Sequence, residues 1–128
     1  MLEVDVIGDA MPYERVREAC VLAAASADVD DGHVAVQFVD AARIATLNAE
    51  HRGKDGPTDV LSFPVDGDGA GWAGTGSREL GDVVICPEHT EDLLEAVVHG
   101  VLHLTGMDHE QDDGEMLVLQ AEILGWIR

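Results

Sequence analysis

Three of the six histidines in this 128-residue chain lie close together, at His99, His103 and His109. The apolar residues before and between them recur at helical spacing, which predicts that the first two histidines belong to one helix. Side chains four positions apart on a helix project from the same face, so both imidazoles can reach one ion. The type and spacing of these residues therefore predict a metal site.

A third ligand can come from His109 because Gly106 follows the last apolar position of the helix. Glycine is the residue expected where a helix ends in a left-handed turn, and such a turn would bring His109 back to the ion. Three neutral histidines leave the fourth position of a tetrahedral zinc open to water, as in catalytic zinc sites. Zinc lowers the pKa of that water and makes hydroxide available near neutral pH. We expect one zinc ion per chain.

The elements that must position these histidines follow from the hydrophobic pattern. It predicts strands at 2–7, 33–39, 60–63 and 80–86, and helices at 12–27, at 41–51, from Pro87 through the histidines, and from about 116 to 125. Two adjacent strands in mid-chain break strict alternation of strand and helix. We therefore expect an α+β fold in which residues 1–128 form a single domain, a small mixed sheet with helices packed on it.

Composition places the chain among globular proteins with one core, since 46% of its residues are hydrophobic. The longest wholly apolar stretch, residues 19–25, is too short to span a bilayer, and the N-terminus lacks the basic and apolar regions of a signal peptide. We expect a soluble, cytoplasmic protein. Cys20 and Cys86 lie in apolar surroundings without a C-x-x-C pattern, so we expect two buried thiols.

The charge is unusual for a protein that acts on nucleic acid. A formal net charge of −19 opposes binding to phosphates, which usually depends on lysine and arginine. Two causes remain open: adaptation to high salt, in which repulsion is screened, and a codon bias against lysine. Three of the seven basic residues, Arg52, Lys54 and Arg78, fall in the middle segment that we place near the site.

The histidine stretch resembles two known signatures that differ at one position. The metzincin peptidases have three histidines and a glycine at these places, but a glutamate base follows their first histidine, where this chain has Gly100. Glycine cannot deprotonate water, so a peptidase of this class would lack its base. Residues 99–109 instead fit every specified position of H-G-x-L-H-L-x-G-x-D-H, the motif of the YbeY-type endoribonucleases. We expect a zincin-like metal helix in a nuclease.

A second segment, residues 47–64, resembles the other signature of that family, L-N-x-x-Y-R-x-K-D-x-P-T-D-V-L-S-F-P, with His51 in place of the tyrosine. Residues 80–86 are similar to the family's L-G-D-I-V-I strand. The resemblance implies an α+β domain with a four-stranded sheet. It also implies a zinc-dependent, single-strand-specific endoribonuclease that acts in 3′-end maturation of small-subunit (16S) ribosomal RNA and in ribosome quality control. Its implied partners are ribosomal RNA, the small ribosomal subunit and ribosomal proteins.

By the same resemblance, His99, His103 and His109 are the zinc ligands and Arg52 is the functional arginine. A guanidinium suits this role because its planar donors can share the negative charge that develops on phosphate oxygens during cleavage. By residue type alone, Arg52 could equally form a surface salt bridge. We assign catalysis to Arg52 and His99, and substrate binding to Arg52 and, as a weaker candidate, Lys54.

The general base stays open among metal hydroxide, Asp108 and Glu110, and Asp108 could instead orient a histidine. Two other functions also remain open. One is a different metallohydrolase, such as a peptidase or esterase, which Gly100 disfavours. The other is a metal-stabilised ribosome-assembly docking protein with little hydrolytic activity, whose acidic surface would favour basic ribosomal proteins over RNA.

Overall fold

The computed structural model describes residues 2–65, 78–107 and 114–128, and its elements follow the predicted order. The strands are β1 (Leu2–Ile7), β2 (Gly32–Phe38), β3 (Val60–Pro64) and β4 (Glu79–Ile85). The helices are α1 (Tyr13–Ser26), α2 (Ala41–Arg52), the short 3₁₀ helix η1 (Pro87–His89), α3 (Leu93–Leu104) and α4 (Glu115–Ile127). None of the described helices has the length and apolar character needed to cross a membrane.

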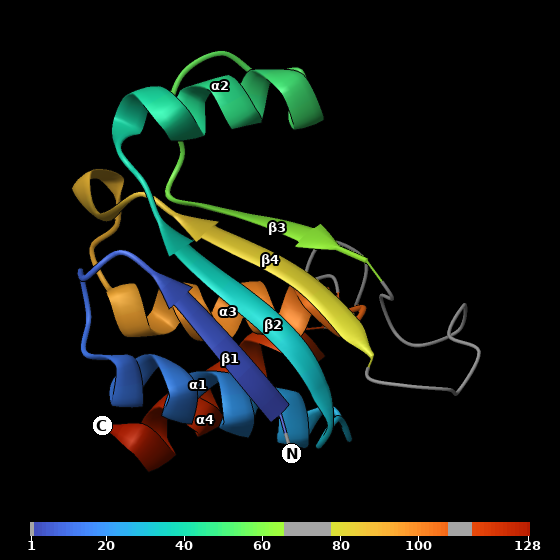
Figure 1. Ribbon diagram of the computed structural model, residues 1–128. Coiled ribbons are helices and arrows are strands. Elements are labelled where there is room, and N and C mark those ends of the chain that lie inside the picture. The colour runs from blue at the N-terminus through green and yellow to red at the C-terminus, as the bar shows by residue number, and fades with distance from the viewer. Residues whose placement is uncertain (1, 66–77, 108–113) are drawn as a thin grey trace.

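The four strands form one mixed sheet in the order β1-β2-β4-β3 (Figure 1). The β1–β2 and β2–β4 pairs are parallel, whereas β3 runs antiparallel to β4 at the edge of the sheet. The expected α+β fold with a small mixed sheet is confirmed. The antiparallel edge strand is the consequence of the two adjacent mid-chain strands.

Helices cover both faces of this sheet, because its strands alternate their side chains between two hydrophobic clusters. On β4, Val83 and Ile85 belong to the larger cluster, which they share with α1, α3 and α4. Val84 and the following Cys86 belong to a smaller cluster beneath α2. Figure 1 shows α2 alone on one side of the sheet and α1, α3 and α4 on the opposite side. Helices α2 and α3 therefore approach β3 from opposite faces.

The histidine helix begins later than predicted. We expected it to open at Pro87, but η1 occupies 87–89, and α3 begins at Leu93 with Asp92 as its N-cap. The Asp92 carboxylate accepts a hydrogen bond from the Glu95 N–H at 3.1 Å, which satisfies a donor that the first turn leaves without a helical partner. Glu88 is not in the first turn of α3, and its carboxylate instead accepts from the Ala41 N–H at the start of α2.

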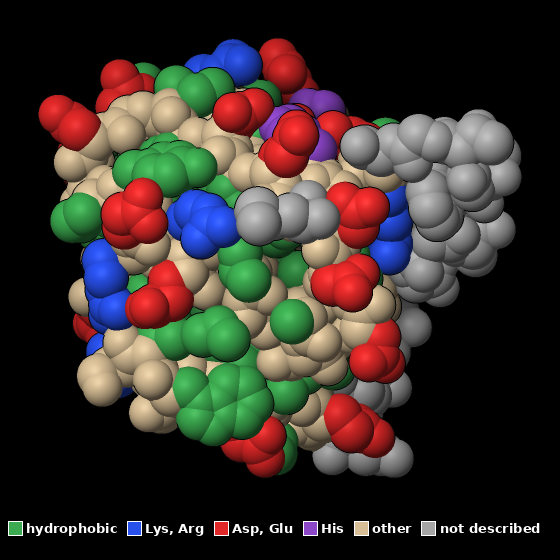
Figure 2. Space-filling view, turned by 60° about the horizontal axis from the view of Figure 1, so that its bottom comes forward, with side chains coloured by type: hydrophobic (Ala, Val, Ile, Leu, Met, Phe, Trp, Pro, Cys, Tyr) green, Lys and Arg blue, Asp and Glu red, His purple; other side chains and the backbone are tan. Residues whose placement is uncertain are grey.

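Charged side chains are spread over the face that Figure 2 shows, and the described side chains there do not form one acidic patch. Figure 2 brings the side of α1 and α4 forward and shows Asp and Glu scattered among apolar and a few basic side chains. Cys20 and Cys86 are both buried and free, as predicted. Burial raises the pKa of the Cys20 thiol to about 12, so this thiol stays protonated.

Candidate active site

Helix α3 carries the first two histidines on a rigid element that is buried along most of its length. Its first turn is capped by Asp92. At its other end, Gly106 has a φ of 102°. The Gly106 N–H donates a hydrogen bond to the His103 carbonyl, and the Met107 N–H donates one to the Leu102 carbonyl. This pair of bonds is the left-handed glycine stop that the sequence predicts. The chain therefore turns back immediately after His103.

The imidazoles of His99 and His103 face each other across one helical turn. Their ring centroids are 4.7 Å apart with an interplanar angle of 75°, and their two Nε2 atoms are 3.2 Å apart. His103 Nδ1 lies 2.9 Å from the Met107 carbonyl oxygen, and His99 Nδ1 lies 2.8 Å from Gln120 Oε1. Both oxygens only accept hydrogen bonds, so each Nδ1 carries the hydrogen, and in a neutral ring each Nε2 carries a lone pair.

Two lone pairs that face each other at 3.2 Å repel unless a cation lies between them. Two nitrogens that bind one tetrahedral zinc at about 2.0–2.1 Å lie about 3.3–3.4 Å apart. A zinc ion thus fits this pair of histidines, because their Nε2 atoms face each other at nearly the required distance and both rings carry the hydrogen on Nδ1. Ligating histidines almost always donate their other ring N–H to an oxygen, as both do here.

Gln120 is a residue of this site that the sequence interpretation missed. It lies on the buried face of α4, only 9% exposed, and its amide oxygen accepts from the His99 ring. The sequence does contain a signal for Gln120, because this polar residue falls at a core position of the helix between Met116 and Ile123. A buried polar side chain needs a partner, and here the partner is a predicted metal ligand.

The predicted third ligand, His109, lies outside the described residues, as do Asp108 and Glu110. Within residues 2–65, 78–107 and 114–128, no group of three His, Cys, Asp or Glu side chains is placed to hold a metal. The described part of the candidate metal site thus consists of His99 and His103.

A cleft of about 680 Å³ joins these histidines to the second sequence motif. Its lining residues come from the end of α2, from β3 with the residue before it, and from α3: His51, Arg52, Asp59, Val60, Leu61, Ser62, Phe63, Pro64, His99 and His103. The structure therefore brings Arg52 to the same cleft as His99 and His103. Lys54 lies past the end of α2, is exposed, and is not among the residues that line the cleft.

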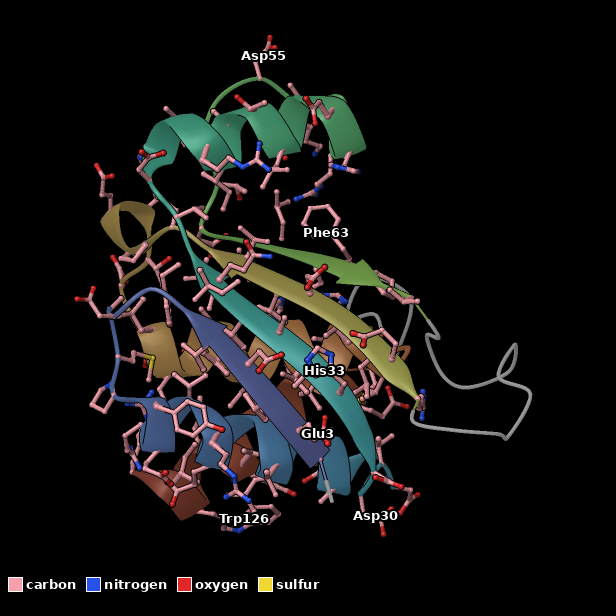
Figure 3. The ribbon with its side chains drawn as sticks, viewed as in Figure 1. Glu3, Asp30, His33, Asp55, Phe63 and Trp126 are labelled. Carbon is pink, nitrogen blue, oxygen red and sulfur yellow. The ribbon has the colours of Figure 1, made fainter. Side chains whose placement is uncertain are left out.

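Aromatic rings meet where α2 faces β3. The His51 and Phe63 rings have centroids 4.7 Å apart and pack edge to face at 69°. Figure 3 shows Phe63 projecting from β3 toward α2. In the sequence, His51 stands out only as a departure from the family pattern, and no pattern marks Phe63 as a cleft residue.

The structure gives a packing reason for the glycine at position 100, which the sequence did not reveal. Gly100 is buried against β4, and a Cβ at this position would lie 2.4 Å from Val83 Cγ1. The position that carries a catalytic glutamate in the metzincin signature therefore faces the sheet, and no larger side chain fits there. This contact weighs against the peptidase alternative independently of the missing base.

Two groups outside the cleft, Asp92 and His33, have pKa values shifted by their neighbours. Partial burial would raise the pKa of Asp92, but its hydrogen bonds to Arg128 and to the Glu95 N–H lower that pKa overall. His33, on β2, bridges the neighbouring strands β1 and β4 through Asp5 and Glu79, each at 2.7 Å; Figure 3 labels His33 on the sheet. The Asp5 hydrogen bond, with Glu79 adding to it, raises the His33 pKa, although burial opposes the shift.

Comparison with known proteins identifies a family and relatives to which this chain is similar. A family model described as Endoribonuclease YbeY matches residues 9–127. A protein named Endoribonuclease YbeY from Rubrobacter xylanophilus is 39% identical over 127 residues, covering 94% of this chain and 89% of the relative. Its namesake from Bradyrhizobium diazoefficiens is 39% identical over 146 residues, covering 97% and 80%.

The fold also has a solved counterpart. The solution structure of TM1509 from Thermotoga maritima aligns with a TM-score of 0.63 at 30% identity, covering 99% of this chain and 89% of that one. The residues matched by the family model include every element that lines the cleft.

Proposed function

This chain belongs to the Endoribonuclease YbeY family, and from that premise we propose that it is a zinc-dependent hydrolase that cleaves phosphodiester bonds of single-stranded RNA. The observation that carries the proposal is the pair of Nε2 atoms 3.2 Å apart, in the same cleft as an arginine. We propose small-subunit ribosomal RNA, at its 3′ end, as the substrate, with ribosomal proteins as partners. Only the family resemblance supports this finer assignment.

The proposed chemistry assigns each residue a separate task. His99 and His103 would hold the ion, together with His109 if the chain follows the family pattern. When bound, zinc supplies Lewis-acid stabilisation of negative charge and acidifies water. The Gln120 amide and the Met107 carbonyl keep the ring N–H groups on Nδ1 and so keep both Nε2 lone pairs directed into the cleft.

Arg52 would bind the phosphate from the opposite wall of the cleft. Its guanidinium can donate two hydrogen bonds to two phosphate oxygens, and these bonds strengthen as negative charge develops during cleavage. Its position at the end of α2 is fixed by the αL turn at Gly53, whose φ is 66° and whose N–H donates to the Ala49 carbonyl. Lys54 lies beyond this turn, so we assign it at most a contact with a more distant part of the RNA.

The test combines metal content with cleavage. We expect one zinc per chain by elemental analysis, and cleavage of a single-stranded RNA that stops when a chelator is added. His103→Ala should lose both zinc and activity. Arg52→Ala should keep zinc and lose activity by about 10²-fold, the usual effect of removing one donor to developing charge. Arg43→Ala is the matched control, because Arg43 is exposed on the same helix and does not line the cleft.

Each contrary result has a specific meaning. Undiminished cleavage by Arg52→Ala would remove this arginine from the mechanism. Cleavage that survives complete removal of zinc would overturn the metal dependence. One zinc per chain without any cleavage would favour the metal-stabilised docking protein, for which the net charge of −19 is the supporting observation.

A further inference from the structure

The cleft follows the outer edge of strand β3. Six consecutive residues, 59–64, line it. Successive side chains of a strand point to opposite faces of the sheet, so one face would be lined only by every second residue. A cleft that touches all six must run along the strand's edge, where the main chain is accessible. Figure 1 shows this edge as the sheet's border, with α2 and α3 on either side of it.

The hydrogen bonds that flank β3 determine which main-chain groups face the cleft. The Cys86 N–H donates to the Asp59 carbonyl at 2.8 Å, and the Val65 N–H donates to the Leu80 carbonyl at 3.0 Å. In an antiparallel pair, residues alternate between bonding to the partner strand and facing away from it. Positions 61 and 63 therefore bond to β4, and positions 60, 62 and 64 direct their main-chain groups into the cleft.

Only one N–H donor remains available along this edge. The Val60 N–H already donates to the Asp59 carboxylate at 2.8 Å, and Pro64 has no N–H. Ser62 presents both its N–H and its carbonyl. An added peptide strand would need donors at alternating residues, and proline and charge are the features that block strand addition at sheet edges. The edge therefore suits a single planar group that has one acceptor beside one donor.

Ser62 is also held next to the candidate metal ligands. Its hydroxyl donates to the Gly100 carbonyl of α3 at 3.2 Å, directly after His99 in the chain. Arg52 lies on the α2 side of the same cleft, and the Phe63 ring, which packs against His51, offers an aromatic surface in that cleft. A phosphate between Arg52 and the histidines would place a neighbouring nucleotide along Ser62.

We infer that the outward N–H and carbonyl of Ser62 bind the base of one unpaired nucleotide next to the cleaved phosphate. Each of the four RNA bases carries an acceptor beside a donor on its Watson–Crick edge, and in a duplex this edge is occupied by the complementary base. The contact thus supplies a physical reason for single-strand specificity, with little preference among bases. The inference rests on the proposed function.

A matched pair of variants isolates the main-chain donor. Ser62→Pro removes the N–H, and proline is tolerated on an edge strand where the N–H points away from the sheet. Ser62→Ala removes the hydroxyl but keeps the N–H, so it is the reference for Ser62→Pro. The substrates are one single-stranded RNA and copies in which successive nucleotides near the cleaved bond are abasic.

In the zinc-loaded Ser62→Ala enzyme, one abasic position should lower kcat/KM by about 25-fold, the effect of losing two ordinary hydrogen bonds. In Ser62→Pro, the same abasic position should lower kcat/KM by only about fivefold, because the base has already lost the N–H and keeps a hydrogen bond to the carbonyl alone. Equal abasic effects in both variants would overturn the inference and leave the proposed function intact. If the wild-type enzyme cleaves no RNA under any condition, the proposed function is refuted, and the inference is refuted with it.

Hydrogen exchange of the wild-type protein tests the same contact without a substitution. A single-stranded 2′-O-methyl oligonucleotide should slow exchange of the Ser62 amide and leave the Phe63 amide unchanged, because Phe63 already bonds to β4. Slowing of the Ser62 amide by an extended lysine-rich peptide, and not by the oligonucleotide, would overturn the inference and assign this edge to a polypeptide.

Discussion

Replacing Gly100 with alanine tests the packing that sets the distance between α3 and the sheet. The new Cβ would lie 2.4 Å from Val83 Cγ1 and 3.0 Å from Val83 Cγ2, whereas non-bonded carbons prefer about 3.5–4.0 Å. Val83 cannot easily move aside, because it is fully buried and its β-branched side chain has few alternative rotamers. Helix α3 itself would have to shift.

The expected effect is the difference between two opposing contributions. Overpacking a core costs about 1–3 kcal/mol, and so close a contact belongs near the upper value. Alanine is about 1 kcal/mol more favourable than glycine inside a helix. We therefore expect Gly100→Ala to lower the free energy of unfolding by about 2 kcal/mol, which corresponds to a decrease in Tm of about 8 °C for a domain of this size.

Urea denaturation of four proteins measures the effect: wild type, Gly100→Ala, Val83→Ala and the double variant. Shortening Val83 removes both methyl groups that the new Cβ would meet, so in the Val83→Ala background the overpacking cost of about 3 kcal/mol should largely disappear and only the favourable helix propensity should remain. If Gly100→Ala stabilises the protein by about 1 kcal/mol, helix propensity alone determines the change in the free energy of unfolding, and the packing argument is refuted. If the two substitutions are additive, the contact is not the cause.

Three further predictions concern the proposed zinc site, the titration of His33 and the surface charge. Gln120→Leu should weaken zinc binding about 10- to 100-fold, as loss of an oxygen partner to a ligating histidine typically does, and Gln120→Glu should retain affinity in a competition assay with a chromophoric chelator. The interactions that raise the pKa of His33 stabilise the folded state. Their contribution to the free energy of unfolding is complete below the ordinary histidine pKa of about 6.5 and is lost as pH rises through the folded-state pKa. Urea denaturation at increasing pH should therefore show the wild type losing stability relative to His33→Gln, and parallel curves would contradict this. If the acidic composition reflects adaptation to high salt, Tm should climb steadily with added KCl, and a flat response would exclude that cause.

The elements that position the site were predictable because their signals are local. The spacing of apolar residues around His99 and His103 indicates the helix, and Gly106 indicates its left-handed end. The start of α3 was predicted wrongly because proline is common in the first turn of a helix, and Pro87 does begin a short one. The Asp92 cap lies only a few residues later, and two such signals in one short segment cannot be ranked from the sequence alone.

The rest of the site depends on contacts between residues that are distant in the chain. Gly100 was interpreted from chemistry as the absence of a base, whereas the structure shows that the sheet excludes any side chain there. Gln120 becomes meaningful only when α4 packs beside α3 and brings its amide to His99. The outward donor of Ser62 depends on the register of β3 against β4, which a one-residue slip would invert.

The large negative charge limits how this protein can recognise RNA. With 26 acidic and seven basic residues, long-range attraction to phosphates is unavailable, and repulsion acts over the Debye length of about 8 Å at physiological salt. Recognition must therefore depend on contacts shorter than that distance. The contacts that we propose in the cleft are of this kind: the Arg52 guanidinium for a phosphate, the Ser62 main chain for a base and the Phe63 ring for stacking. Added salt screens the surface repulsion more strongly than these direct contacts, so an acidic surface and an RNA substrate are compatible when binding is confined to the cleft.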